Sequence, residues 1–477
     1  MAITPATQSR GASIQAATSE NYLDIQNNGW AQQYLPDLME KEAEVFGKRT
    51  ISGFLSQVSA EEAMSADQVI WSEQGRLHLS YRCDMLDVTA STINITHNID
   101  GVAQTTNHGI RVGDQVLISG GSGGTVTARV SVAAANSQTI TVQPYAAAHM
   151  TNLSYVNGDN DCRILVFGSE NAKGTAYVGD RANEPQFTTF TNKPIILKDM
   201  YEVSGSDVSQ IGWVEVSGED GQSGYYWYLK AEGDTRARFT DYLEMSMIES
   251  ELVAENSAIA LPTDGGAGTA GTEGLFAAIT SRGHQTSGVT GVNAATDLAE
   301  FDAILAEFDK NGAIEENMLF VNRATALAFD DMLASMNSYG AGGTSYGVFE
   351  NDEDMALNLG FSGFRRGSYD FYKSDWKYLN DLSTRGGINE GATTDAVRGV
   401  IIPAGVSSVY DEMLGKNMKR PFLHVRYRAS QTESRQMKTW ITGSVGAVTS
   451  DLDAMTVNFL SERCMVVQGA NNFMLMN

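Results

Sequence analysis

Two segments with a two-residue hydrophobic period, far apart in the sequence, place the strongest limit on the fold. In the first, which begins at Gln68, Leu77, Leu79 and Tyr81 alternate with polar residues, as in a half-exposed strand. The second segment runs from Pro194 to Val203. Strands separated this widely pair across an excursion of the chain, so we expect a long hairpin.

The segment between these strands, from about Met85 to Val156, has a different composition. Its short alternating runs are separated by Gly, Asn and Ser residues. The runs are Ile93–Ile95, Ile110–Val112, Val116–Ile118, Val126–Val132 and Ile140–Val142. This spacing predicts a small all-β module inserted into the hairpin. We expect Arg163–Phe167 to resume the hairpin.

The second half of the chain alternates between helical and strand periods. A helix is predicted over Asp234–Asn256, with Asp234 as its cap. A second helix is predicted over Asp297–Asp309, where Asp297 and Glu300 form a capping pattern. Further predicted elements are a strand at Met318–Val321, a helix at Thr325–Met336, strands at Val397–Ile402 and Phe422–Arg428, and a strand-rich end from Met437 to Met476. The fold class is therefore mixed, α+β.

The beginning of the chain is polar and weakly patterned. Residues Met1 to about Tyr34 hold few large apolar groups, which is typical of an arm, and Pro36–Phe46 is predicted as a short helix. The first residues lack the basic start and apolar run of a signal peptide, so none is expected.

Composition limits the class of partner. The chain has 477 residues, 42% of them hydrophobic, and a formal net charge of -25. Such a surface repels nucleic acid and anionic lipid, so we expect only weak contact with DNA and no membrane partner. The three cysteines, Cys83, Cys162 and Cys464, are far apart, which favours reduced thiols in an intracellular site of folding.

One glycine-rich stretch has the spacing of a dinucleotide-binding turn. Gly266, Gly268 and Gly271 form G-x-G-x-x-G. The fingerprint requires a buried strand before the glycines and an acidic residue after a second strand. Here a predicted helix and Pro262 come first, and no acidic partner follows at the usual distance. We therefore interpret the stretch as a connector and predict no cofactor.

Other matches to catalytic and metal-binding motifs have a simpler interpretation. The two G-x-S-x-G matches, around Ser122 and Ser345, lack the strand and helix of a nucleophile elbow and are interpreted as loops. The six histidines show no paired metal-ligand spacing. The acidic run Glu350–Asp354 is interpreted as a solvated face, and Tyr225–Tyr228 as a strand. The sequence predicts no catalytic residue, no metal site and no enzyme.

The order of these parts resembles the major capsid proteins of tailed bacteriophages, which share the Hong Kong 97 fold. VIWSEQGRLHLSYR resembles the outgoing strand of the family's E-loop, and PQFTTFTNKPIILKDMYEVSGS resembles the returning strand. DTRARFTDYLEMSMIESELVAEN resembles the spine helix, and MLFVNRATALAFDDML the strand and helix of an A-domain. Coat proteins of crAss-like and marine short-tailed phages are among the similar sequences.

The resemblance implies a division of the chain into five parts. They are an N-terminal arm with short helices (1–67), an E-loop (68–230) with an inserted β module (85–156), the spine helix of the P-domain (231–262), an A-domain (263–410), and return strands of the P-domain (411–477). In this scheme the glycine stretch joins the spine helix to the A-domain.

The resemblance also implies a function. A capsid protein assembles with itself into pentamers and hexamers of an icosahedral shell around double-stranded DNA, in the cytoplasm of a bacterial host, with portal, scaffold and decoration proteins as partners. We expect a separate scaffold protein and no covalent cross-link of the kind that some relatives form. Candidate inter-subunit contacts are Trp71, Leu77, Leu79 and Tyr81 in the E-loop and Arg365 and Arg366 in the A-domain.

Three alternatives remain open from the sequence. One is another self-assembling virion or surface-layer protein. A second is an encapsulin-like compartment of the same fold. The third is a nucleotide-dependent enzyme, which rests only on the glycines at 266–271.

Overall fold

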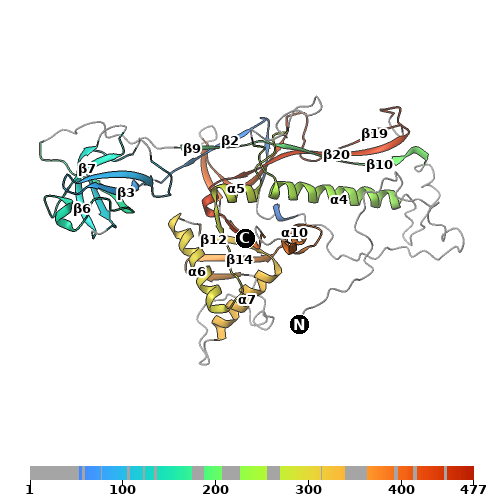
Figure 1. Ribbon diagram of the computed structural model, residues 1–477. Coiled ribbons are helices and arrows are strands. Elements are labelled where there is room, and N and C mark those ends of the chain that lie inside the picture. Colours follow the sequence, from blue (N-terminus) through green and yellow to red (C-terminus); the bar gives the residue numbers. More distant parts are fainter. Residues whose placement is uncertain are drawn as a thin grey trace. The chain divides into compact units, whose positions relative to one another are not determined.

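The structure is a computed structural model that divides into two compact units. One comprises Met1–Ile70 with Thr191–Asn477, and the other is Trp71–Phe190 (Figure 1). The described residues are 53–55, 60–76, 78–104, 108–121, 124–133, 137–174, 187–206, 226–254, 269–312, 314–338, 363–391, 396–404, 406–411, 416–444 and 448–477. The predicted arm, the helix at 36–46, Leu77, Gly266, Gly268, Ser122, Ser345 and the acidic run at 350–354 lie outside these residues.

The smaller unit contains a closed barrel in the order β3-β4-β7-β6-β5-β8. Its strands are β3 (Ser80–Asp87), β4 (Thr92–Asn98), β5 (Asp114–Ser119), β6 (Val126–Ala133), β7 (Thr139–Pro144) and β8 (Cys162–Ser169). A short 3-10 helix, η1, spans Met150–Leu153. Alternate side chains of each strand point inward and are buried, among them Ile93, Val116 and Ile164. Closure leaves the barrel strands without a free edge.

The barrel is larger than the module that the sequence indicates at 85–156. It begins at Ser80 and ends at Ser169 because its first and last strands pair with each other and close it. Residues 163–167 form a strand as predicted and pair with the outgoing segment at Ser80–Arg82, although this pairing belongs to the barrel. The prediction that the segment at 194–203 pairs with the outgoing segment was wrong, because residues 195–204 pair with residues 454–463. The outgoing strand β2 (Val69–Gln74) pairs instead with β9 (Phe187–Asn192) as a two-stranded sheet.

The larger unit contains a five-stranded sheet built around one long strand, β20 (Ala454–Val467). Its other strands are β1 (Ala60–Met64), β10 (Ile195–Ser204), β18 (Leu423–Arg428) and β19 (Lys438–Gly443). β10 pairs antiparallel with β20 over ten residues, from Ile195 opposite Arg463 to Ser204 opposite Ala454. β1 pairs parallel with β18.

A long helix, α4 (Tyr226–Glu249), packs on one face of this sheet (Figure 1). Phe239 and Leu243 on the helix contact Val457 and Phe459 on β20. The prediction placed this helix at 234–256, so both bounds were wrong.

The two errors have different physical reasons. Asp234 lies inside the helix, because the segment from Tyr226, predicted as a strand, is its first turn. Four aromatic residues are too few to distinguish a two-residue period from a helical one. The helix ends at Glu249, and Leu252 then forms a β-bridge with Gly271.

The second sheet of this unit has six strands in the order β11-β21-β15-β12-β14-β13. They are β11 (His284–Thr286), β12 (Glu316–Val321), β13 (Gly363–Arg366), β14 (Tyr369–Asp375), β15 (Gly399–Pro403) and β21 (Met474–Met476). Helices α5 (Leu275–Arg282), α6 (Ala294–Lys310) and α7 (Arg323–Ser338) accompany it, with short helices α9 (Lys377–Asn380) and α10 (Arg385–Gly391) and the 3-10 helix η3 (Ala470–Asn472). A separate pair, β16 (Val406–Asp411) and β17 (Lys416–Pro421), forms a two-stranded sheet.

The local predictions in this region are confirmed to within a few residues. The structure has helices at α6 and α7 and strands at β12, β15 and β18 where the sequence predicts them. The cap of α6 is Asn293, whose side chain accepts from the N–H of Thr296, rather than Asp297. Asp297 is buried in the first turn and accepts from the N–H of Gly291 at 2.8 Å. β21 belongs to the six-stranded sheet, so the return strands after 411 do not all join one sheet.

Candidate functional site

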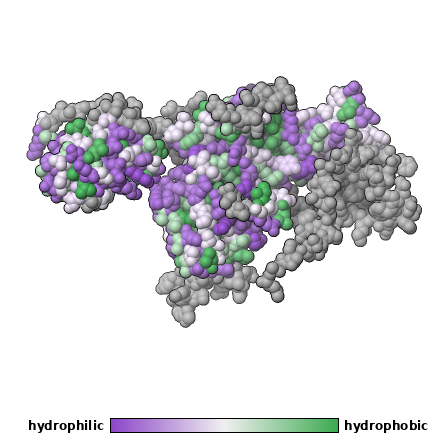
Figure 2. All heavy atoms as spheres, viewed as in Figure 1, coloured by the Kyte–Doolittle hydropathy of each residue, from purple (hydrophilic) through white to green (hydrophobic). Residues whose placement is uncertain are grey.

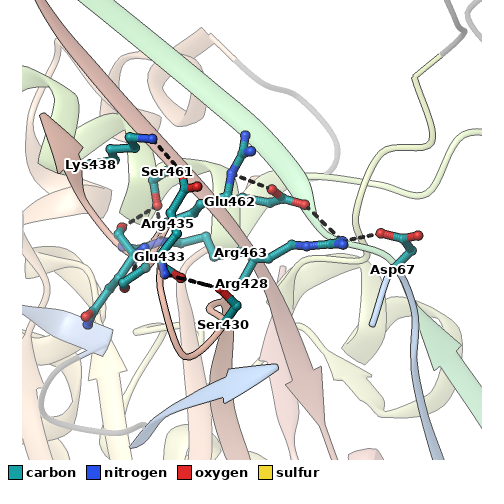
Figure 3. Close-up of polar contacts among 11 residues, drawn as sticks. Asp67, Arg428, Ser430, Glu433, Arg435, Lys438, Ser461, Glu462 and Arg463 are labelled. Carbon is teal, nitrogen blue, oxygen red and sulfur yellow. Dashed lines mark hydrogen bonds and ion pairs between the residues drawn. The ribbon is translucent and has the colours of Figure 1, made fainter. Parts of the chain in front are cut away.

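Charged side chains form a network on β20, where the sequence Ser461-Glu462-Arg463 interrupts a largely apolar strand (Figure 3). Glu462 is only 6% exposed. Its carboxylate lies 2.8 Å from Nε of Arg435 and 3.6 Å from Nη1 of Arg428. Arg428 also contacts Asp67. A buried carboxylate between two guanidinium groups keeps its charge compensated.

The neighbouring residue, Arg463, is also buried and has a separate set of partners. Its Nε donates to Oγ of Ser461 at 2.9 Å, and its Nη2 donates to the carbonyl of Gln436 at 2.9 Å. Its Nη1 lies 3.7 Å from a carboxylate oxygen of Glu61. Burial lowers the pKa of Arg463, while Glu61 and Glu244 act in the opposite direction. Consecutive strand residues face opposite sides of a sheet, so Glu462 and Arg463 place charge on both faces.

Strand β1 supplies carboxylates to two arginines of this sheet, Arg463 and Arg426. Glu61 contacts Gln436 and Arg463, and Glu62 lies 2.9 Å from Nη2 of Arg426 on β18. These ion pairs cross the parallel pairing of β1 with β18, which joins residues more than three hundred positions apart, as in Ala60 opposite His424. The network therefore fixes an early strand of the chain to late ones.

A second anchor holds the residues that precede β1. The carboxylate of Glu244, on α4, accepts the backbone N–H of Gly53 at 2.7 Å and that of Leu55 at 3.3 Å. Phe54, between them, stacks on Trp376 with ring centroids 4.3 Å apart. Burial raises the pKa of Glu244, and the two N–H donors oppose that shift. Together the contacts fix residues 53–55 in the core of the larger unit.

The C-terminal end of α4 has a third polar contact. Glu249 accepts from the hydroxyl of Tyr378 at 2.6 Å and from Nη1 of Arg385 at 2.7 Å. The guanidinium of Arg385 also lies over the ring of Phe276, 5.9 Å from its centroid. These contacts join helix α4 to α9 and α10, and α10 to α5.

These three clusters hold elements of the fold in position. Each couples a carboxylate to guanidinium, hydroxyl or backbone N–H donors, and each joins elements from distant parts of the chain. The described residues hold no group of three or more His, Cys, Asp or Glu side chains that could bind a metal ion. Within the described part of the chain, no helix combines the length and hydropathy that a membrane crossing requires.

The predicted contact residues of the E-loop strand are mostly covered within their own unit. Trp71 is 8% exposed and lies 6.1 Å from Phe190 between ring centroids. Tyr81 is 7% exposed, and its hydroxyl accepts the N–H of Gly109 at 2.8 Å. Leu79 is half-buried against the barrel core. Contact of these residues with another subunit stays a prediction, and the side chain exposed beside them is Ile70, at 63%.

The two predicted arginines of the A-domain have partners on neighbouring elements. Arg366 makes a two-pronged pair with Asp302 of α6, at 2.8 Å and 2.7 Å. Arg365 lies 3.6 Å from Asp370 and keeps 62% of its side chain exposed. Both line a pocket of about 170 Å³ whose other walls are apolar side chains of α6, α7 and β13. Their contact with another subunit also stays a prediction.

Just before helix α5, two backbone N–H groups have partners within the chain. The N–H of Glu273 donates to Oδ1 of Asn192 at 2.8 Å, and that of Gly274 donates to the carbonyl of Ser250 at 2.7 Å. Asn192 also donates to the carbonyls of Glu273 and Met465. The beginning of α5 therefore packs on the end of α4.

The sequence analysis missed all three polar clusters. A signal was present in the adjacent charges of Glu462 and Arg463 within the apolar run NFLSERCMVV. Charged residues are almost never buried unless they are paired, so that run implied partners on other strands. The partners themselves lie up to four hundred positions away and carry no local signal.

The chain matches no protein-family model and no curated protein. It is similar to solved phage structures. One, from Mycobacterium phage Ogopogo, is 11% identical with a TM-score of 0.40, over 93% of this chain and 97% of that one. The capsid structure of the cyanophage P-SCSP1u is 8% identical with a TM-score of 0.40, over 93% of each chain. The mature capsid of bacteriophage PhiM1 is 8% identical with a TM-score of 0.38, over 92% of this chain and 91% of that one.

Proposed function

We propose that this protein is a major capsid protein with the Hong Kong 97-type fold, which assembles into pentamers and hexamers of an icosahedral shell around a phage DNA genome. One observation carries the proposal. Among the described residues, the sheet of β2 and β9 has two strands, and a two-stranded sheet is at best marginally stable in water. Ile70 on β2 is 63% exposed. Cover by a neighbouring subunit would stabilise such a ribbon.

A second strand supports assembly. β10 is the terminal strand of the five-stranded sheet among the described strands. Its exposed side chains include Ile196 at 53% and Met200 at 60%. An exposed edge with apolar residues favours contact with another chain. Figure 2 shows hydrophobic and hydrophilic residues mixed over the face of the molecule that it presents.

The order of elements agrees with the family that the sequence resembles. The proposed E-loop contains β2, the barrel and β9, and the proposed P-domain contains α4, β10 and β20. The proposed A-domain contains the six-stranded sheet with α6 and α7. In this scheme the barrel is the inserted module of the E-loop.

The proposal includes the partners and the location of the protein. It assembles with itself, with a portal, a separate scaffold and decoration proteins as further partners, in the cytoplasm of the bacterial host and then in the virion. Its net charge of -25 disfavours tight binding of the packaged DNA. We propose no enzymatic activity.

Sedimentation and negative-stain imaging of the full-length protein test this function. Closed shells are expected, alone or with the scaffold protein of the same phage. Because like charges on the subunits repel, moderate salt should promote assembly. Removal of Met1–Tyr34 should leave capsomers or monomers. A full-length protein that stays monomeric beside its scaffold, or that forms tubes, contradicts the proposal.

A pair of exposed apolar side chains provides a matched test of the ribbon. Ile70→Asp should block shell formation while the melting temperature of the subunit stays unchanged, because this side chain is 63% exposed. Val156→Asp makes the same chemical change at a site on the barrel unit that is 53% exposed. Val156→Asp is the control and should assemble normally. If Ile70→Asp also assembles normally, β2 is not an assembly contact.

A further inference from the structure

Two of the three cysteines lie directly opposite each other in the barrel. Cys83 is on β3, the first barrel strand, and Cys162 is on β8, the last one. The antiparallel register pairs these two residues. Both are fully buried, with 0% exposure, and belong to the same core. Both thiols are free in the structure.

The distance between the Cα atoms of Cys83 and Cys162 follows from the backbone hydrogen bonds between β3 and β8, which form the seam of the barrel. The N–H of Val166 donates to the carbonyl of Leu79, which identifies Ser80 and Leu165 as a pair without mutual hydrogen bonds. Because the two kinds of pair alternate, Cys83 and Cys162 form a hydrogen-bonded pair. The Cα atoms of such a pair lie about 5.5 Å apart, within the range of a disulfide.

The Cβ atoms set the remaining requirement. In directly opposite residues they lie about 4.5–5.5 Å apart, against about 3.8 Å in a disulfide. A hydrogen-bonded pair lies at the wide end of that range, so the two Cβ atoms must approach by about 1.5–2 Å. The register of β3 against β4 shifts between Arg82 and Cys83. A bulge at this position gives the backbone local freedom to move.

Burial keeps the two thiols unreactive while the barrel is closed. It raises the pKa of Cys162 to about 11, and it raises the pKa of Cys83 further, with the neighbouring Cys162 acting in the same direction. Since the thiolate is the reactive form, oxidation requires transient opening of the seam between β3 and β8.

We propose that Cys83 and Cys162 form a disulfide that locks the barrel seam when the protein meets a low-molecular-weight disulfide such as oxidised glutathione. One cysteine attacks the small disulfide, which gives a mixed disulfide and releases one glutathione thiol. The second cysteine attacks the protein sulfur of that mixed disulfide and releases the other glutathione thiol. Two electrons pass to oxidised glutathione, and both protons of the cysteine thiols end on the two glutathiones.

The bond would have a mechanical consequence. The chain enters the barrel at the start of β3 and leaves it at the end of β8, and Cys83 opposite Cys162 is the pair of this seam farthest from those two connections. Force applied to the two connecting segments could open the seam from Ser80 opposite Leu165, but the sulfur atoms would hold the strands together at the far end.

The test uses the full-length protein with oxidised glutathione in urea below the unfolding midpoint, followed by alkylation and peptide mass spectrometry under non-reducing conditions. The expected product is one linked pair of peptides that contain Cys83 and Cys162. The oxidised barrel should melt about 5 °C or more above the reduced one. A reducing agent should reverse both changes.

Cys464 provides the matched control, because it is also fully buried but its nearest sulfur is Sδ of Met64, at 4.0 Å. Cys464→Ser should leave the linked peptides unchanged, whereas Cys83→Ser and Cys162→Ser should abolish them. If a serine variant melts at a lower temperature than the reduced wild-type protein, the alanine variant at the same position is used instead. Unreacted thiols, persistent mixed disulfides or a bond to Cys464 would overturn the proposal.

Discussion

The backbone N–H of Gly53 donates to Oε1 of Glu244 at 2.7 Å, across 191 positions of the sequence. The same carboxylate accepts from Leu55, so one side chain of α4 holds the segment that leads into β1. This anchor and the ion pairs of β20 give three predictions, and His108 and two glycines give two more.

Glu244→Ala should lower the free energy of unfolding by about 1–3 kcal/mol, because two buried N–H groups lose their acceptor. Glu244→Gln keeps one acceptor and should cost less. Urea unfolding of both variants against wild type measures the difference.

The pH dependence of the same residue has a definite sign. Burial raises the pKa of Glu244 in the folded state, so the folded state binds the proton more readily than the unfolded state. Its contribution to stability is therefore largest below about pH 4.5 and falls as pH rises through the raised pKa. Glu244→Gln should remove this contribution to the slope. An unchanged slope in the variant contradicts the assignment.

Glu462→Gln should destabilise the larger unit by roughly 1–3 kcal/mol, because Arg435 and Arg428 lose a buried partner. The matched control is Glu433→Gln, which removes an exposed carboxylate 2.5 Å from Lys438 in the same region. Exposed ion pairs contribute little, so the control should unfold like wild type. Equal losses in the two variants would show that burial of Glu462 is unimportant.

His108 should make the barrel sensitive to acid. Burial lowers its pKa, with Arg111 acting in the same direction, so the folded state disfavours the charged ring. The unfolded chain gains a proton as pH falls below about 6.5, and barrel stability should decline from there toward the lowered pKa. The measurement is the melting temperature of the barrel between neutral and mildly acidic pH. His108→Gln should flatten that dependence, whereas His78→Gln, at an exposed position, should leave it intact.

Two glycine-to-alanine changes should have opposite effects. A Cβ at Gly274 would lie 2.8–2.9 Å from the carbonyl oxygens of Met247, Ile248 and Ser250, so Gly274→Ala should cost about 1–3 kcal/mol. Gly233 lies within α4 with open space around it, so Gly233→Ala should stabilise by about 0.5–1 kcal/mol. Thermal melts of the two variants compare them directly, and a stabilised Gly274→Ala would contradict the packing of α5 on α4.

The sequence predicts elements well where the signal is local. Helix α6 has a capping residue, an apolar face and the Asn311-Gly312 stop within its own length, and its bounds were nearly correct. Helix α4 begins among aromatic residues whose period is ambiguous over four positions, so its bounds were wrong. The strand at 163–167 was assigned to the hairpin because its alternation does not reveal its partner, which is β3.

The polar clusters could not be predicted for the same reason. Glu244 is an ordinary helix residue in the sequence, and its role exists only because residues 53–55 pack against α4. Arg435 and Glu462 meet only because the segment before β19 lies beside β20, where the N–H of Glu462 donates to the carbonyl of Arg435 at 2.9 Å. Long-range register is set by the whole core, whereas sequence periodicity reports only which face of a strand is buried.

The larger unit can fold only after the ribosome has released β20. β10 pairs only with β20 in the described sheet, and α4 packs on Val457 and Phe459 of that strand. β21, synthesised later still, separates β11 from β15. Throughout translation of the intervening residues, β10 has an unpaired edge and α4 an uncovered apolar face. Neighbouring nascent chains on one polysome therefore expose aggregation-prone surfaces to one another. We expect the yield of folded subunits to depend on the supply of chaperones.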